Sequence, residues 1–410
     1  MSGQRESPAD PPSDFGSGLA VLGDVDGDGW RDIAVSAPNA RTPQSAGTGA
    51  VYLFSGKAGR LVETLRGDAN SRGLGSALVA CGDADGDGTG DLLVGAAREG
   101  AVHVVSGGTA RSLGQVRLQT RGSGLVLCDL GVRVTGSNRE LGVLVGHPAF
   151  DGGEGAVSIQ WIRPGTPSWT IRVEGQATGV AHTGFGRSVA ATLPWDGASP
   201  RSRIAVGTPL LESGEAEGGV TLFSGNALSE VARVHGEGGA ESLGSRVVAA
   251  GDIDADGVGD FFVTAFRWSH PRDLVHAGRV IAVSGAQGKV LWIVHGSAAD
   301  ERLGFALGRT DDWDEDGLDD IVVGSPGATP GGAVRVLSSR TGKICHEFRG
   351  IEGSIQFGFR VNAECDLDGD GRADLLVTSL SPGGGQSRGQ PRVEVLLNRA
   401  SNRHLVLTEP

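Results

Sequence analysis

The chain has 410 residues, of which 70 are glycine, and its formal net charge is −13. The glycines follow no Gly-X-Y period, which excludes a collagen-like triple helix. No apolar run reaches the roughly 18 residues that a membrane-spanning helix needs, so no membrane span is expected. The sequence has no basic stripe, which argues against a nucleic-acid partner. A chain of this length suits either a few ordinary domains or one array of repeats.

An acidic pattern, D-x-D-x-D-G-x-x-D, occurs five times, at residues 24–32, 83–91, 252–260, 312–320 and 366–374. Carboxylates at positions 1, 3, 5 and 9 and a backbone carbonyl at position 7 can surround one hard cation. Calcium is the natural candidate, because magnesium demands a stricter octahedron. The predicted calcium-binding residues are Asp24, Asp26, Asp28, Trp30, Asp32, Asp83, Asp85, Asp87, Thr89, Asp91, Asp252, Asp254, Asp256, Val258, Asp260, Asp312, Asp314, Asp316, Leu318, Asp320, Asp366, Asp368, Asp370, Arg372 and Asp374.

One such stretch would be an ordinary acidic turn, but five with the same four aspartates and one glycine indicate a shared ligand. Each is followed by a short apolar run, such as 33–35, and not by the position-12 glutamate and helix of an EF-hand. The loops are therefore expected to join strands of β-hairpins. Five bound divalent ions would bring the net charge from −13 to about −3, so the acidity is a metal-site signature.

Self-similarity divides the chain into seven units that start near residues 15, 73, 122, 184, 242, 303 and 356. In the first unit, strands are expected at 19–23, 33–36, 51–55 and 61–65. The third unit keeps only Asp129 of the acidic loop and the fourth only Asp196, so no metal is predicted in either. Arg201 and Arg203, just after Asp196, would also oppose a cation.

The pairs Phe15-Gly16, Phe185-Gly186 and Phe357-Gly358, with 36–38, 207–209 and 324–326 as approximate Gly-Ala-Pro signatures, resemble the FG-GAP repeat. The seven units over residues 15–410 are similar to the β-propeller of integrin α subunits. The resemblance implies an all-β fold, a seven-bladed β-propeller of four-stranded antiparallel blades, forming a single domain after a polar connector at 1–14.

Stacking such blades around an axis buries both faces of each sheet. The first strand of each blade is expected innermost and the fourth outermost, with the acidic loops together on one face. The last unit completes itself from its own strands at 393–397 and 404–408, so no strand exchange between the ends is needed.

A partner site is predicted on the opposite face, where the loops between second and third strands vary in length. Trp268, His270 and Arg272 are its candidate ligand-binding residues, since aromatic and arginine side chains on loops often dominate binding. The alternative is that Trp268 only covers a blade edge. The tripeptide Arg66-Gly67-Asp68 is better explained by an exit turn than by adhesion. Cys81 and Cys128 are expected to be buried free thiols, although a bridge between them is conceivable.

The sequence thus predicts a calcium-stabilised extracellular scaffold for binding or adhesion, secreted or at the cell surface, although no signal peptide is recognisable at the start of this chain. Its partner would be a protein or a glycan. Histidines are scattered and no catalytic motif is found, so the chain is predicted not to be an enzyme. The alternative function is a calcium-bearing propeller enzyme acting on polysaccharide, as a lyase or hydrolase.

Overall fold

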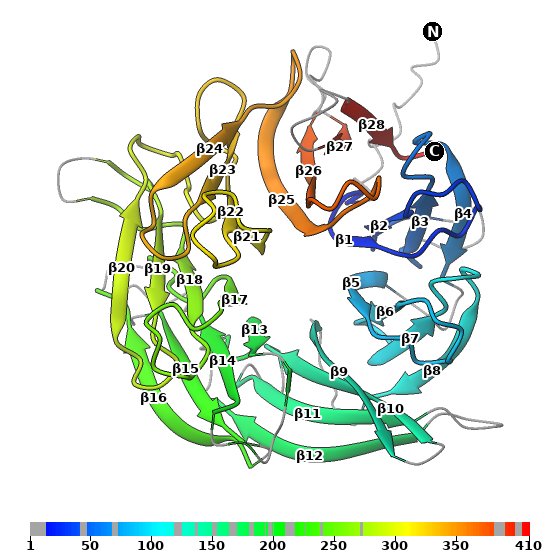
Figure 1. Ribbon diagram of the computed structural model, residues 1–410, viewed down its shortest axis with the longest axis horizontal. Helices are drawn as coiled ribbons and strands as arrows, with labels where there is room; N and C mark the ends of the chain where they lie inside the picture. The colour runs from blue at the N-terminus through cyan, green and yellow to red at the C-terminus, as the bar shows by residue number, and fades with distance from the viewer. Residues whose placement is uncertain are drawn as a thin grey trace, which may run out of the picture.

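The computed structural model describes residues 14–41, 47–67, 73–118, 125–135, 138–149, 154–163, 170–179, 184–192, 194–195, 199, 201–209, 218–225, 227–237, 241–270, 274–380, 390–397 and 404–410. These residues form seven antiparallel sheets of four strands each, arranged in a ring (Figure 1). The described part of the chain contains no α-helix. The predicted all-β, seven-bladed propeller is confirmed.

Each blade consists of four strands that follow one another in the sequence and pair in that order. Blade one is β1–β4, blade two β5–β8, and so on to blade seven, β25–β28. The strands are β1 (Leu19–Val21), β2 (Ile33–Ala37), β3 (Ala50–Phe54), β4 (Leu61–Arg66), β5 (Leu74–Cys81), β6 (Asp91–Ala96), β7 (Ala101–Val105), β8 (Ser112–Arg117), β9 (Val126–Thr135), β10 (Asn138–His147), β11 (Ala156–Arg163), β12 (Thr170–Thr178), β13 (Ser188–Ala191), β14 (Arg203–Thr208), β15 (Gly219–Ser224), β16 (Ser229–His235), β17 (Val247–Ala249), β18 (Phe261–Ala265), β19 (Arg279–Val283), β20 (Val290–His295), β21 (Ala306–Arg309), β22 (Ile321–Ser325), β23 (Ala333–Leu337), β24 (Ile344–Phe348), β25 (Ile355–Cys365), β26 (Asp374–Leu380), β27 (Pro391–Leu396) and β28 (His404–Thr408).

The middle strands of a blade are buried on both faces, because each face packs against a neighbouring blade. In β2, Ile33 and Val35 belong to an apolar cluster shared with blade seven, whereas Ala34 belongs to one shared with blade two. Successive side chains of a strand point to opposite faces, so a continuous apolar run serves two neighbours. The first strands surround the axis of the ring and the fourth strands form its rim (Figure 1). This is the predicted order.

Glycines hold the blades close together at the seams. The glycine just before the third strand forms an isolated parallel bridge with the Phe or Leu that opens the next blade. A β-carbon at any of these glycines would lie 2.1–2.3 Å from the carbonyl oxygen of that residue, which is far inside contact distance. Part of the high glycine content is therefore explained by backbone contact between blades. The bridged pairs are Gly49–Leu74, Gly155–Phe185, Gly278–Leu303 and Gly332–Phe357.

Blades one and seven meet without sharing a strand, as predicted, and hydrogen bonds hold the seam. The Thr378 hydroxyl donates to the carbonyl oxygen of Gly16 at 2.9 Å, and the Asn362 side-chain amide donates to that of Leu19 at 3.2 Å. On the face with the acidic loops, the Arg31 N–H donates to the carbonyl oxygen of Leu367 at 3.0 Å. The two ends of the described chain are thus fastened at several levels of the ring.

Blade three departs from the sequence-based description. Asp129 was expected to be the remnant of an acidic loop, but it lies inside β9 and pairs with Val143 of β10. Only two residues separate β9 from β10, so blade three has no room for a nine-residue loop. Asp196 of blade four lies outside the described residues. The connector at 1–14 falls almost wholly outside them too, and its boundary remains a prediction.

Candidate metal centre

All five acidic stretches connect the first and second strands of their blades. They follow β1, β5, β17, β21 and β25. Because these first strands occupy equivalent places around the axis, the five loops lie on one face of the ring, which we call the acidic face. Blades three and four contribute no such loop in the described residues.

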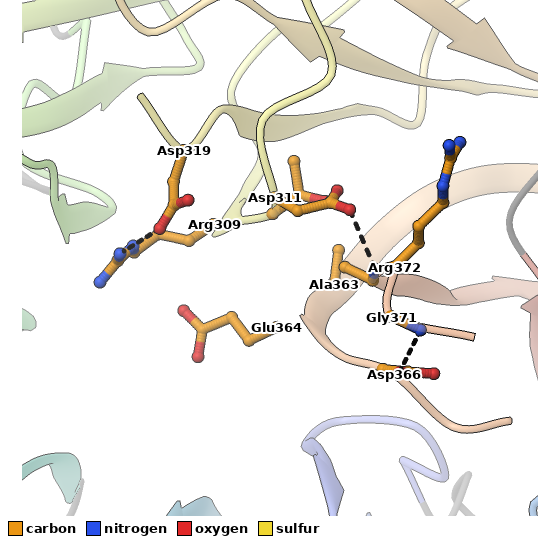
Figure 2. A pocket seen from close by; sticks show the side chains of 10 residues that line it. Arg309, Asp311, Asp319, Ala363, Glu364, Asp366, Gly371 and Arg372 are labelled. Atoms are coloured by element: carbon orange, nitrogen blue, oxygen red, sulfur yellow. Dashed lines mark hydrogen bonds and ion pairs between the residues drawn. The ribbon is translucent and has the colours of Figure 1, made fainter. Parts of the chain in front are cut away.

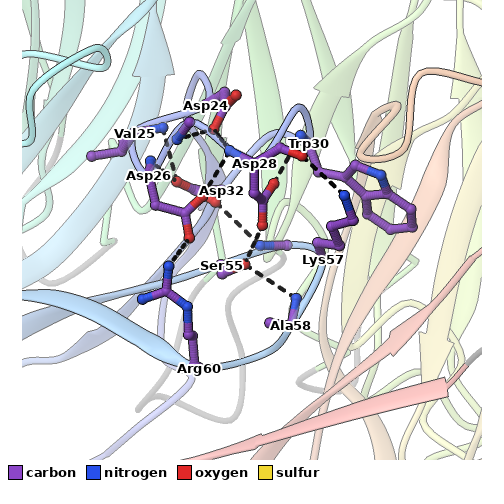
Figure 3. Close-up of polar contacts among 12 residues, drawn as sticks. Asp24, Val25, Asp26, Asp28, Trp30, Asp32, Ser55, Lys57, Ala58 and Arg60 are labelled. Atoms are coloured by element: carbon purple, nitrogen blue, oxygen red, sulfur yellow. Dashed lines mark hydrogen bonds and ion pairs between the residues drawn. The ribbon is translucent and has the colours of Figure 1, made fainter.

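The loop of blade one is curled by its own carboxylates (Figure 3). Asp24 accepts hydrogen bonds from the N–H groups of Gly27 at 2.7 Å, Asp28 at 3.1 Å and Gly29 at 2.8 Å. Asp28 accepts one from the N–H of Trp30 at 3.0 Å. The position-one aspartate accepts the same bond from the position-six N–H in the other four loops, at 2.8–3.1 Å. The sequence repeat is therefore also a repeat of conformation.

The glycine at position six is required by backbone geometry. Its φ is 89° at Gly29 and between 85° and 91° in the other four loops, a region that L side chains rarely adopt. A β-carbon at Gly29 would meet no atom within 4 Å, so lack of space is not the reason. The residue at position four also has a positive φ, which is 61° both at Ala255 in blade five and at Glu315 in blade six. The sequence analysis missed this second constraint.

The aspartate at position nine is the buried anchor of each loop. Asp32 is fully buried and accepts hydrogen bonds from the N–H groups of Val25 at 2.9 Å and Gly56 at 3.2 Å, the latter just after β3. Asp260 and Asp320 make the corresponding pairs of bonds. Burial raises the pKa of Asp32, Asp260 and Asp320 to about 6 in each case, and neighbouring aspartates add to the shift. These carboxylates are thus held in a strongly negative setting.

Carboxylates at positions one, three and nine converge. One oxygen each from Asp24, Asp26 and Asp32 lies within 4.8 Å of the others, and the same holds in blades two and five. Such a set of hard oxygen donors, with raised pKa values at its buried member, fits a calcium ion. In blade one, an oxygen of the fifth-position Asp28 accepts a hydrogen bond from the Ser55 hydroxyl at 2.8 Å (Figure 3), and calcium binding by Asp28 remains a prediction.

Blade six contains two overlapping groups of side chains that could hold a metal ion. Asp312, Asp314 and Asp316 converge in one group, and Asp314 and Asp320 converge with Cys345 in the other. Cys345 is the second residue of β24, where sequence reasoning placed only strand residues. Its thiol lies 4.0 Å from a carboxylate oxygen of Asp320.

Arginines lie against three of the loops, which the sequence analysis did not foresee. Arg60 pairs with Asp26 at 2.8 Å, with 60% of its side chain exposed. Arg340 pairs with Asp316 at 3.0 Å, also from the turn after the third strand. Arg139 reaches from blade three to Asp83 of blade two at 3.2 Å. Each guanidinium offsets part of the loop charge and would compete with a cation for the same oxygens.

Arg201 and Arg203 of blade four contact the neighbouring blade five. The buried Arg203 donates from its Nε to the carbonyl oxygen of Gly285 at 2.8 Å, and the N–H of Gly285 in turn bonds Asp260. The guanidinium of Arg201 lies beside Gly257, in the loop of blade five. These residues, expected to oppose a cation in blade four, therefore border the loop of blade five.

A pocket of about 440 Å³ opens between blades six and seven on the acidic face (Figure 2). Arg309 pairs with Asp319 at 3.0 Å on one side, and Asp311 accepts a hydrogen bond from the Ala373 N–H at 3.1 Å on the other. Glu364 of the innermost strand β25 also lines it. The described lining contains no histidine, cysteine or serine, but it includes Thr310, whose hydroxyl donates to a carboxylate oxygen of Asp311 at 3.2 Å.

The structure buries Trp268 between two blades. Its indole is 7% exposed and belongs to the apolar cluster between blades four and five. It stacks on His295 with ring centroids 4.2 Å apart and meets the edge of His270 at 5.6 Å. A ligand contact or a cover for a blade edge was expected, and the burial of this large apolar ring agrees with the second of these. Arg272 lies outside the described residues, and ligand binding by this loop remains a prediction.

Two smaller expectations are met. The Gly67 N–H donates to the carbonyl oxygen of Gly49 at 3.0 Å, which suits an exit turn, while Asp68 lies outside the described residues. All four cysteines, Cys81 and Cys128 among them, are free.

Comparison with known proteins identifies the repeat. Residues 15–54 match the FG-GAP repeat family, which confirms the resemblance for the first blade. Integrin alpha-5 of Xenopus laevis is 31% identical over 179 residues, which are 39% of this chain and 17% of that protein. Integrin alpha-E of Mus musculus is 29% identical over 169 residues, 36% of this chain and 14% of that protein.

A second kind of relative also matches. Phosphatidylinositol-glycan-specific phospholipase D of Rattus norvegicus is 26% identical over 200 residues, 41% of this chain and 23% of that protein. The matches thus span less than a quarter of the length of these three relatives.

Solved structures match the fold. The crystal structure of BBS1N in complex with ARL6DN has a TM-score of 0.55 at 11% identity and covers 91% of both chains. The Cps50 (Swd1) β-propeller domain of Myceliophteria thermophila has a TM-score of 0.50 at 9% identity, covering 90% of this chain and 93% of that one. These likenesses show the propeller architecture alone. Within the described residues, no helix has the length and apolarity to cross a membrane.

Proposed function

We propose that this chain is a calcium-stabilised extracellular propeller that serves as a binding or adhesion scaffold. The observation that carries the proposal is the convergence of the carboxylates at positions one, three and nine in loops of one shared conformation. Without a cation, such groups repel one another at short range. Calcium levels outside the cytosol suit sites of micromolar to millimolar affinity, which supports a secreted or cell-surface location.

In blade one, calcium would be held by Asp24, Asp26 and Asp32, with Asp28 and the carbonyl of Trp30 completing the shell. The bound ion would supply the positive charge that joins the loop carboxylates. The chain's own residues do the rest: Asp32 ties the loop to the turn after β3, and Gly29 allows the curl. Calcium would thus fasten the first two strands of a blade to the third.

The similarity to integrin α subunits supports an adhesion-type scaffold. The partner would be a protein or a glycan, bound on the face opposite the acidic loops. Loops there need no fixed chemistry for the fold, which leaves them free for recognition. Because Trp268 is buried, it is not proposed as a contact for this partner.

The test separates calcium from the partner. Purified chain, first stripped of metal, is titrated with calcium by calorimetry and then screened on a glycan array and in pull-downs with and without calcium. Five calcium ions per chain and calcium-dependent retention of a partner are the expected results. Fewer than four ions at millimolar calcium would refute the loop assignment, whereas five ions with no partner would refute only the scaffold role.

The similarity to phosphatidylinositol-glycan-specific phospholipase D makes an enzyme the alternative function, but this similarity covers only 41% of the chain. The pocket in Figure 2 carries carboxylates and arginines in which Arg309 and Asp311 are already bonded to protein groups. We therefore propose a non-enzymatic role. Hydrolysis of a phosphodiester or polysaccharide by the purified chain, lost in Glu364→Gln, would contradict this.

A further inference from the structure

Three arginines gather near the axis of the ring, at the end opposite the acidic face. Arg187 immediately precedes β13, Arg246 immediately precedes β17, and Arg360 lies in β25. All three follow within three residues of the Phe-Gly or Leu-Gly pair that opens blades four, five and seven. We call these residues the axial arginine cluster.

Contacts between blades place the cluster at one level of the ring. The hydroxyl of Ser188, next to Arg187, donates to the carbonyl oxygen of Gly244, two residues before Arg246, at 2.7 Å. The Nε of Arg360 donates to the carbonyl oxygen of Ser17 in blade one at 3.2 Å. The three positive charges therefore come from strands that converge on the axis.

Their charges act on one another. Burial, with the charges of Arg360 and Arg187, lowers the pKa of Arg246 to about 9. Burial and Arg187 likewise lower the pKa of Arg360, while the exposed Asp14 acts in the opposite direction. Positive groups held this close without neutralisation raise the free energy of the folded state.

Arg187 is exposed and Arg246 and Arg360 are half-buried, whereas three more deeply buried arginines of this protein are neutralised by carboxylates. Arg279 pairs with Glu241 at 2.7 Å, Arg335 pairs with Glu301 and with Glu347, and Arg392 pairs with Glu394. Within the described residues, the axial arginines pair with no carboxylate; Arg246 donates to the carbonyl oxygen of Ser245 and Arg360 to those of Ser17 and Phe359. The positive charge of the cluster is therefore open to a counter-ion from solution.

Phenylalanines wall the cluster on the side of blade six. The ring centroid of Phe305 lies 5.1 Å from that of Phe266 and 4.9 Å from that of Phe359. The guanidinium of Arg360 lies over Phe359, 4.9 Å from its centroid. Phe305 and Phe359 also line a neighbouring pocket of about 350 Å³ that contains both Arg302 and Asp300. An apolar wall strengthens the attraction between guanidinium groups and an anion, because it keeps water away.

We propose that the axial arginine cluster binds an oxyanion of the phosphate or sulfate class, free or as an ester on a small molecule. A tetrahedral oxyanion with two negative charges offers several acceptor oxygens to the flat guanidinium forks. The site lies on the opposite end of the axis from the acidic loops and does not depend on calcium.

The test uses metal-free and calcium-loaded full chain with sulfate, inorganic phosphate and glucose 6-phosphate as probes. Calorimetry and melting temperature are compared with sodium chloride at equal ionic strength, since unspecific screening would affect both alike. Arg246→Gln and Arg360→Gln should each weaken sulfate binding by about ten-fold or more. The matched control is Arg309→Gln, on inner strand β21 but paired with Asp319, and it should bind sulfate like the wild type.

The melting temperature of the variants shows whether a loss of binding is caused by misfolding. In anion-free buffer, Arg246→Gln should melt no lower than the wild type, because it removes a positive charge that has no partner. Tighter binding of glucose 6-phosphate than of inorganic phosphate would identify an ester as the ligand class, and the reverse a free anion. The proposal fails if sulfate acts on the wild type no more than chloride does, or if Arg309→Gln loses as much binding as Arg246→Gln.

Discussion

Gly332 forms a parallel bridge with Phe357 across the seam between blades six and seven, and a β-carbon on Gly332 would lie 2.3 Å from the carbonyl oxygen of Phe357. The φ of Gly332 is 103°, which adds a second obstacle to any side chain. This one contact combines the two reasons for which the chain uses so much glycine.

Replacing Gly332 with alanine should therefore lower the free energy of unfolding by about 2–4 kcal/mol, from overpacking and backbone strain together. Chemical denaturation measures the loss. Gly251→Ala is the control, because a β-carbon there would meet only the Leu318 side chain, at 4.0 Å. Equal stability of the two variants would show that the seam can open to admit a methyl group.

Asp26→Asn should remove one calcium ion and leave the calcium-free protein nearly as stable as the wild type. Asp26 is paired with the largely exposed Arg60, and the loss of that pair is offset by the removal of one of three converging negative charges. In calcium at a hundred times the dissociation constant, the lost site costs about 2.7 kcal/mol. Calorimetric stoichiometry and melting curves with and without calcium give both values. Asp319→Asn, at a loop position outside the predicted ligand set, should keep the full count, and a lost ion there would argue against that set.

The position-nine aspartates predict opposite pH dependences with and without calcium. The pKa of Asp260 is raised to about 6 from the ordinary 3.8. In the absence of calcium, the native state therefore binds the proton more tightly than the unfolded state. The stability that the protonated Asp260 contributes to the native state is fully present below about pH 4 and is lost as the pH rises to 6. Calcium needs the deprotonated form, so the calcium-loaded protein should gain stability over the same range.

Comparing the wild type with Asp260→Asn isolates this contribution, since other carboxylates titrate in both proteins. In metal-free buffer, the stability of the wild type relative to the variant should fall between pH 4 and 6. A relative stability that rises with pH in metal-free buffer would mean that the buried carboxylate is stabilised as an anion by the fold itself.

Trp268→Ala should destabilise the protein by about 3–5 kcal/mol, because it empties a buried site between blades four and five. His270→Ala, which removes a half-buried ring at the edge of the indole, should cost much less. Thermal melts distinguish the two, and binding to any partner found in the screen is measured in parallel. If Trp268→Ala melts normally but no longer binds, the ligand-contact hypothesis would be restored.

Much of the architecture could be predicted because it repeats in the sequence. The seven self-similar units predicted the number of blades, and the place of the acidic pattern that contains Asp24 and Gly29 in five of them predicted the face of the loops. The loop pattern could not reveal that Arg139 reaches Asp83 from another blade, because that contact joins residues 56 positions apart. Local patterns report local structure, and the seams between blades are not local.

The errors have a physical cause as well. Asp129 was read as a loop remnant since aspartate favours turns, but the long hairpin of β9 and β10 placed it in a strand. Trp268 was read as a candidate ligand-binding residue from the composition of its loop, and its burial next to His295 agrees with the alternative that it covers a blade edge. The axial arginine cluster could not be predicted, because its members follow the Phe-Gly or Leu-Gly pairs of three different repeats and only closure of the ring brings them together.

The seam between blades one and seven has a consequence for the order of the chain. It is held by hydrogen bonds such as Thr378 to Gly16, and no strand crosses it. The ring has seven seams between neighbouring blades, and the ends of the chain could lie at any one of them without a change in the blades. A circular permutant, with the two ends joined by a linker and new ends cut between β20 and β21, for example at 297–299, would therefore keep every blade whole. Such a permutant could present a fused domain at a different point on the circumference without altering the fold.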